Sequence, residues 1–140
     1  METSDVRKRI LDVLNSARRD AAERRTRNAE AGAAYEKFLE TVVTKVFRQV
    51  ADVLKAERVL CAVETPAGAV RLSSERSASD FVEIRLDTNA ARPHVVVHAE
   101  RVKGRERYEE TQPIREGVGI EHLTDQDVLD ALAGVIGVFA

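Results

Sequence analysis

The change of hydrophobic period at Arg58 is the sequence feature that most limits the fold. Before this residue, apolar side chains recur every three or four positions, which is typical of amphipathic helices. After it, apolar and polar residues alternate and turn signals follow at short intervals, which is typical of antiparallel strands. We therefore expect an α+β protein in which a helical region precedes a sheet.

Two helical segments are expected before the sheet. Apolar residues recur at helical spacing from Val6 to Ala17, and acid–base pairs four residues apart, such as Asp20 with Arg24, extend this first helix. The second segment, AAYEKFLETVVTKVFRQVADVLKAE, carries a broad apolar face that suits packing on a sheet or in a bundle. The N-terminal region is thus one long helix or a broken helix pair.

Asn28 and Gly32 mark a weak point between the two segments. The chain can turn back here as a helical hairpin or run on with a local loss of stability, and the sequence leaves both open. We divide the chain into residues 1–32, a protruding or hairpin-forming helix expected to mediate oligomerisation, and residues 33–140, an α+β core domain.

Five strands are expected to form an antiparallel meander. In order they are RVLCAVE, AVRLSSE, DFVEIRLD, HVVVHAERV and ERYEETQPI, the last a weak polar strand at the edge of the sheet. The segments TPAG and KGR supply two of the turns. Thr124 then caps a final helix, which we expect to pack on the same face of the sheet as the Phe38–Leu54 helix.

Two neighbouring strands carry charged residues and histidines at every second position. Glu83 and Arg85 share one face of the third strand, and His94 and His98 share one face of the fourth. If these two faces coincide, they form a charged surface with cross-strand ion pairs that faces solvent. The same surface is a candidate for binding a ligand or a partner.

No residue pattern indicates catalysis, a metal or a cofactor, so an enzyme is the less favoured interpretation. Four residues of strand separate His94 from His98 by about 13 Å, whereas zinc–nitrogen bonds are about 2.1 Å long. The two histidines therefore cannot share an ion, and both are expected at the surface. The segment SSERSASD lacks nucleophile-elbow glycines, and EGVGIEHLTD lacks a phosphate-loop pattern. Cys61 is expected to be an inert, buried thiol.

The segment SARRDAAERRTRNAEAG places five arginines between Arg18 and Arg27. On a helical wheel they point in all directions among interleaved acids, whereas a helix that binds nucleic acid concentrates its cations along one stripe. Alanines of the same segment, such as Ala17 and Ala21, continue the helix face begun by Ile10 and Leu14. A face of small side chains suits close packing against another helix. The interaction residues expected on this helix are Ile10, Leu14, Ala17, Ala21 and Arg25.

The favoured function is a non-catalytic, homo-oligomeric protein-interaction module, such as an adaptor or a chaperone-like protein. Its expected partners are a second copy of the chain, as a homodimer, and an unidentified protein. One alternative is a nucleic-acid-associated regulator that uses residues 18–27. Another is a small-molecule binder or enzyme with a pocket between helix and sheet, near Cys61 or the histidines.

Composition and the apolar runs indicate where the protein works. The chain has a net charge of −2, with 44% hydrophobic and 33% charged residues, as in an ordinary globular protein. Its N-terminus has no apolar signal segment, and the run ALAGVIGVFA is far shorter than the roughly 20 residues that span a bilayer. We expect a cytoplasmic protein with no membrane contact. The excess of arginine over lysine and the abundant alanine favour a bacterial origin.

Overall fold

A single helical rod forms the first part of the chain. The computed structural model, which describes residues 1–90 and 92–140, contains helix α1 (Thr3–Phe38), a π-helical turn η1 (Leu39–Val43) and helix α2 (Thr44–Ala56). Both the backbone N–H and the hydroxyl of Thr44 donate to the carbonyl oxygen of Leu39, five residues earlier. This wide turn adds one residue to the helical repeat without ending the helix. Gly32 lies inside α1, so the chain runs on and the hairpin alternative is not adopted.

The sheet is the predicted five-stranded antiparallel meander. Its strands are β1 (Cys61–Glu64), β2 (Val70–Ser74), β3 (Phe81–Asp87), β4 (His94–Lys103) and β5 (Glu106–Pro113), and they lie side by side in chain order. A two-residue turn joins β4 to β5 and pairs Lys103 with Glu106. Gly104, at φ 63°, begins this turn in a backbone conformation that glycine adopts readily.

The C-terminal segment contains helix α3 (Asp125–Val135). A short 3₁₀ turn precedes it, η2 (Ile120–His122), and another follows it, η3 (Ile136–Phe139). Thr124 caps α3 as predicted. The Asp127 N–H donates to the Thr124 hydroxyl at 3.3 Å, and the Thr124 N–H donates to the Asp127 carboxylate at 2.9 Å. This reciprocal pair satisfies two backbone donors at the start of the helix.

One apolar core joins the helices to one face of the sheet. The end of α1, η1, α2 and α3 all contribute to it, so α3 packs on the same sheet face as the Phe38–Leu54 helix, as expected. Its largest fully buried apolar side chains are Phe47, Leu72, Ile84 and Leu132. Tyr35 ties α1 to the sheet, because its hydroxyl hydrogen-bonds the Gly68 carbonyl at 2.7 Å and lies 3.1 Å from that of Ile84.

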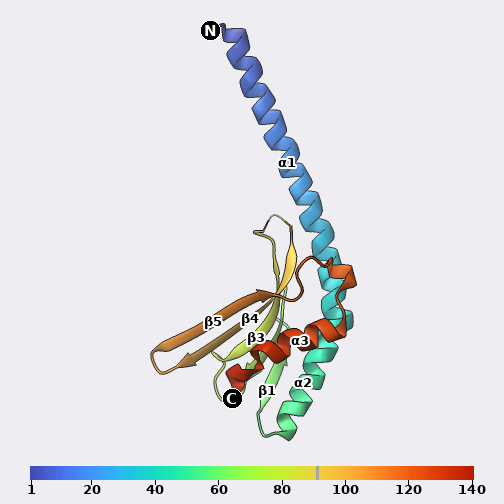
Figure 1. Cartoon of the computed structure of the whole chain (residues 1–140), viewed down its shortest axis with the longest axis vertical. Helices are drawn as coiled ribbons and strands as arrows, with labels where there is room; N and C mark the ends of the chain where they lie inside the picture. The colour runs from blue at the N-terminus through green and yellow to red at the C-terminus, as the bar shows by residue number, and fades with distance from the viewer. Residues whose placement is uncertain (91) are drawn as a thin grey trace.

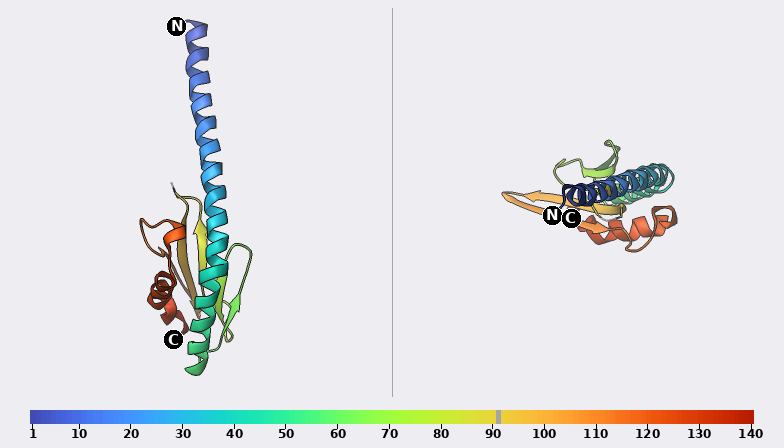
Figure 2. Two further views of the ribbon diagram at one scale, coloured as in Figure 1. Left: turned by 90° about the vertical axis from the view of Figure 1, so that its right-hand side faces the viewer. Right: turned by 90° about the horizontal axis from the view of Figure 1, so that it is seen from above.

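Most of α1 extends away from this core into solvent (Figures 1 and 2). Between Met1 and Glu30 every residue except Ala21 is exposed, and Ala21 is half-buried. A helix of this length projects by about 42 Å at 1.5 Å per residue. Neither α1 nor any other helix in the described part of the chain combines the length and hydropathy that crossing a membrane requires.

Candidate interaction and binding sites

The protruding part of α1 exposes large aliphatic side chains. They are Val6, Ile10, Leu11, Val13 and Leu14. Ile10 and Val13 are each 53% exposed. On a helical wheel these five side chains span an arc of about 160°, and Ala17 and Ala21 fall within it. Between Val6 and Ala17 this arc is apolar except for Arg7. None of the described residues packs on it, and we call it the α1 face.

The α1 face lies on the same side of the helix as the residues that pack on the sheet, with Arg24, Arg25 and Asn28 between the two. The predicted residues Ile10, Leu14 and Ala17 are exposed on it, and the same spacing of three and four residues leads on to Tyr35 and Phe38 in the core. A helix laid along the α1 face would therefore end beside the α+β domain.

The arginines of α1 are solvated. Arg25 is exposed, like the other four arginines between Arg18 and Arg27. Within residues 1–90 and 92–140, none of the ion pairs shorter than 4 Å involves a side chain of α1. The acid–base pairs predicted four residues apart, such as Asp20 with Arg24, are thus not formed, because exposed side chains gain little from pairing in water.

The face of the sheet opposite the helices brings the predicted charged residues together. In the register of β3 with β4, Glu83 lies opposite His98 and Asp87 lies opposite His94, so the two strand faces coincide. The burial differs from the expectation. His98 and Glu83 are each only 2% exposed, so the prediction that both histidines lie at the surface is wrong for His98, while His94 is half-buried.

Long side chains on the sheet itself bury Glu83. The Arg71 Nε donates to one Glu83 carboxylate oxygen at 2.7 Å, and the Arg85 Nε donates to the other. The Arg71 guanidinium also lies 4.0 Å from the centroid of the Phe81 ring. The aliphatic part of an arginine side chain can cover neighbouring surface while its guanidinium group stays in contact with water. The arginine side chains on this sheet face therefore shield the Glu83 carboxylate from solvent.

His98 lies at the centre of a second polar cluster, formed by β4 and β5. Its Nδ1 is 2.6 Å from the Thr111 hydroxyl oxygen, and its Nε2 lies 3.5 Å from Glu109 Oε1 and 3.8 Å from Glu100 Oε2. Among the described residues, this Nε2 is buried and has no hydrogen-bond partner. The ligand-capable atoms of His98, Glu100 and Glu109 all lie within 4.8 Å of one another.

The ionisation of this cluster follows from its surroundings. Burial lowers the pKa of His98, and the nearby Arg85 charge lowers it further. A hydrogen bond from Arg107 lowers the pKa of Glu100. Both shifts favour a neutral imidazole beside an ionised carboxylate.

Sequence reasoning missed Glu109 and Thr111, because it compared the faces of the third and fourth strands and did not consider how the fourth strand pairs with the fifth. The signal that identifies them is the KGR turn. A two-residue turn at Gly104 sets the β4–β5 register, in which Glu100 lies opposite Glu109 and His98 lies opposite Thr111.

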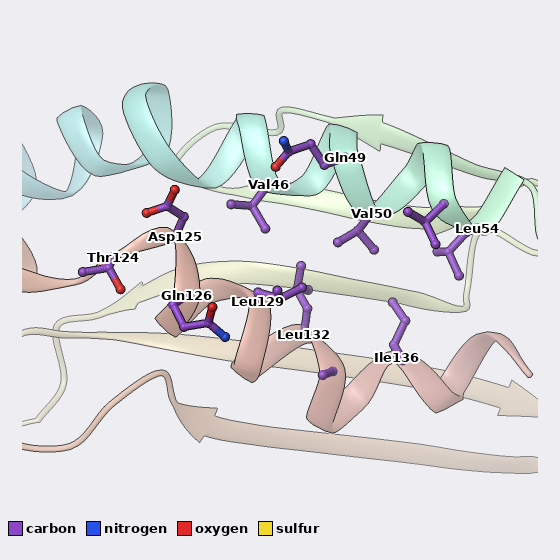
Figure 3. Close-up of a pocket in the computed structure, with 12 residues that line it drawn as sticks. Val46, Gln49, Val50, Leu54, Thr124, Asp125, Gln126, Leu129, Leu132 and Ile136 are labelled. Carbon is purple, nitrogen blue, oxygen red and sulfur yellow. The ribbon is translucent and has the colours of Figure 1, made fainter. Parts of the chain in front are cut away.

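An apolar groove of about 670 Å³ lies between α2 and α3 (Figure 3). Its apolar lining comes from Val46, Val50 and Leu54 on one side and Leu129, Leu132 and Ile136 on the other. Gln49 and Gln126 lie among the polar residues that line it. The groove thus lies between two helices, whereas the small-molecule alternative placed a pocket between helix and sheet, near Cys61 or the histidines. A separate, smaller pocket is lined by Pro93, His94 and Pro113, among others. Cys61 itself is partly buried, and burial raises its pKa.

No protein-family model matches the chain, and neither does any curated protein or solved structure compared with it. Function is therefore inferred from the surfaces and side-chain clusters of this chain.

Proposed function

We propose that the protein is a homodimeric interaction module, in which residues 1–32 pair two chains and residues 33–140 form the domain that each chain presents to a further protein. The observation that carries this proposal is the exposed α1 face. An isolated helix with such a face is only marginally stable in water, and a second copy of the same helix can cover it.

The accessible surface of the chain supports pairing. The chain exposes 9710 Å², whereas a compact monomer of 15.5 kDa exposes about 7,200 Å². The excess of about 2,500 Å² is larger than the roughly 800 Å² that each partner contributes to a standard stable interface. The protruding helix thus has enough surface for a dimer contact.

Side-chain sizes favour an antiparallel pair. If the helices cross with their centre between Asn15 and Ser16, Ile10 lies opposite the partner's Ala21 and Leu14 lies opposite the partner's Ala17. Each large side chain then meets a small one, which lets the two helices pack closely along the contact. Residues 1–30, the exposed stretch, have their midpoint at the same place, so each helix would end where the other domain begins.

Charge favours the same orientation. Residues 18–30 contain five arginines and three acidic residues, whereas residues 2–13 contain three basic and three acidic residues. An antiparallel pair places the cationic residues 18–30 of one helix beside residues 2–13 of the other, which carry no net charge. A parallel pair would place the two cationic segments beside each other, where they repel. The resulting dimer has two-fold symmetry and places its two domains at opposite ends.

Sedimentation analysis of the full chain tests self-association. We expect twice the 15.5 kDa chain mass for the wild-type protein and the mass of a monomer for the double variant Ile10→Asp, Leu14→Asp. The matched control is Ser16→Asp, Thr26→Asp, which adds the same two charges at exposed positions on the other side of the helix and should remain dimeric. A wild-type protein that stays monomeric at high concentration would contradict the proposal.

Cysteine cross-linking tests the orientation of the helices. In a Cys61→Ala background, an antiparallel pair predicts that Ile10→Cys forms a disulfide when mixed with Ala21→Cys. Ile10→Cys alone should not cross-link. Efficient self-cross-linking of Ile10→Cys would indicate parallel helices and would disprove the antiparallel arrangement.

Nucleic-acid binding through α1 is a second candidate function, favoured by the five exposed arginines. Replacing Arg18, Arg19, Arg24, Arg25 and Arg27 together should abolish binding to random duplex DNA at low salt if this candidate is correct. No binding by the wild-type protein at low salt would eliminate it.

A further inference from the structure

We propose that His98, Glu100 and Glu109 bind a divalent transition-metal ion, Zn²⁺ being the ion that best fits this ligand set, on the sheet face opposite the helices. The site is separate from the α1 face, and it does not depend on the proposed dimer.

The first observation is the unpartnered nitrogen of His98. The imidazole is 2% exposed, and its Nε2 lacks a hydrogen-bond partner among the described residues. A buried polar atom without a partner is costly, and native proteins seldom keep one without a reason. This nitrogen points to two carboxylate oxygens that lie beyond ordinary hydrogen-bond distance, at 3.5 and 3.8 Å.

The second observation is that these separations suit a metal. Ligand atoms of a tetrahedral zinc site, at bond lengths near 2.1 Å, lie about 3.4 Å from one another. The two distances from Nε2 are within a few tenths of an ångström of this value, and all three ligand atoms fall within 4.8 Å. Small rotations of the glutamate side chains would complete the geometry.

The third observation is the support around the ligands. With its hydrogen on Nδ1, the imidazole donates to the Thr111 hydroxyl at 2.6 Å and directs the Nε2 lone pair at the carboxylates. Arg107 donates to Glu100 Oε1, which leaves Oε2 as the oxygen that faces His98. The Phe81 ring, whose centroid lies 6.0 Å from that of His98, provides an apolar wall.

The ligand types identify the class of ion. One imidazole and two carboxylates form a mixed nitrogen–oxygen set of the kind that zinc accepts, whereas Ca²⁺ and Mg²⁺ prefer oxygen ligands alone. The Glu109 side chain is 54% exposed, so it opens the site to solvent on one side. Water can occupy a fourth coordination position there.

Calorimetric titration of ZnCl₂ into chelator-treated full-length protein tests the site. We expect one Zn²⁺ per chain, and Glu109→Gln should weaken the affinity at least about tenfold by analogy with the loss of supporting groups at metal sites. Glu109 is the ligand to change because its exposure makes misfolding of the variant less of a concern than for His98. The matched control is Glu110→Gln, since Glu110 is the next residue and lies on the other face of β5.

Three further measurements separate this site from adventitious binding. Co²⁺ should give the visible absorption of a four-coordinate site in the wild-type protein and lose it in Glu109→Gln. Thr111→Val, which removes the hydrogen bond to Nδ1, should weaken Zn²⁺ binding about tenfold. His94→Gln should bind as the wild type does, since His94 lies outside the cluster.

Two outcomes would overturn the proposal. One is the absence of stoichiometric Zn²⁺ binding, in which case the imidazole of His98 and the carboxylates of Glu100 and Glu109 have a structural role only. The other is binding that persists unchanged in Glu109→Gln, whether or not it is lost in His94→Gln. The double variant Ile10→Asp, Leu14→Asp should still bind Zn²⁺, so failure of the dimer proposal and failure of the metal proposal are distinguishable.

Discussion

The two ends of the α1–α2 rod belong to one continuous helix but differ in their surroundings. Beyond Gly32, Tyr35, Phe38 and Phe47 are buried against the sheet, whereas Ile10 and Leu14 at the other end remain exposed. Both ends are helical because both have helical spacing and good helix-forming residues. Local sequence preference thus explains why the rod is a helix, and only contact with the sheet explains which of its apolar side chains are buried.

The width of the apolar face distinguishes the two ends further. Over residues 35–56 the apolar face is broad and includes large aromatic side chains, which suits a sheet. Over residues 6–21 it narrows from aliphatic side chains to alanines, which suits another helix. The difference indicates that the sheet can bury the apolar face of residues 35–56, whereas the face of residues 6–21 needs another helix to cover it.

The largest expected effect is at the buried end. Phe47→Ala should lower the free energy of unfolding by about 3–5 kcal/mol, because it leaves a cavity in the core. Urea denaturation followed by circular dichroism measures this change. Val53→Ala on the same helix is the control, since Val53 is 65% exposed, and its effect should stay within about 0.5 kcal/mol. Equal losses in the two variants would mean that α2 does not bury Phe47 against the sheet while leaving Val53 exposed.

A smaller effect is expected where the rod meets the sheet. Tyr35→Phe removes the hydroxyl that bonds the Gly68 carbonyl at 2.7 Å, and it should lower the free energy of unfolding by about 1 kcal/mol. The same denaturation measurement applies. If the variant were as stable as the wild type, this hydrogen bond would not help to hold α1 to the domain.

The smallest expected effect is at Gly32, between the two ends of the rod, and it is a stabilisation. Gly32 lies in the helix, and, apart from its chain neighbours and the nearby backbone of its own helix, no atom of the described residues lies within 4 Å of a Cβ placed at this position. Gly32→Ala should therefore stabilise the helix by about 0.5–1 kcal/mol, which a thermal melt followed in the far ultraviolet detects. Destabilisation, or loss of the dimer, would reveal a close approach by a partner helix at Gly32.

The sheet faces show how far sequence reasoning reaches. Alternation along DFVEIRLD and HVVVHAERV correctly predicted which side chains share a face, because side-chain direction alternates strictly along a strand. It did not predict that His98 and Glu83 are buried, because their covering comes from neighbouring strands. The Arg71 side chain on β2 and the Thr111 and Glu109 side chains on β5 enter this face only through strand register.

By itself, the sequence determined the main helices and strands, their order, the cap at Thr124 and the side chains that share a face of the third and fourth strands. These depend on local backbone preference and on the period of apolar residues, both of which are readable along the chain. Only the tertiary structure decided that the rod continues through Gly32, that α1 is left exposed, and that His98 meets Glu100 and Glu109. These outcomes depend on contacts between residues that are distant in sequence or lie on adjacent strands. The energies of such contacts cannot be read from a local sequence pattern.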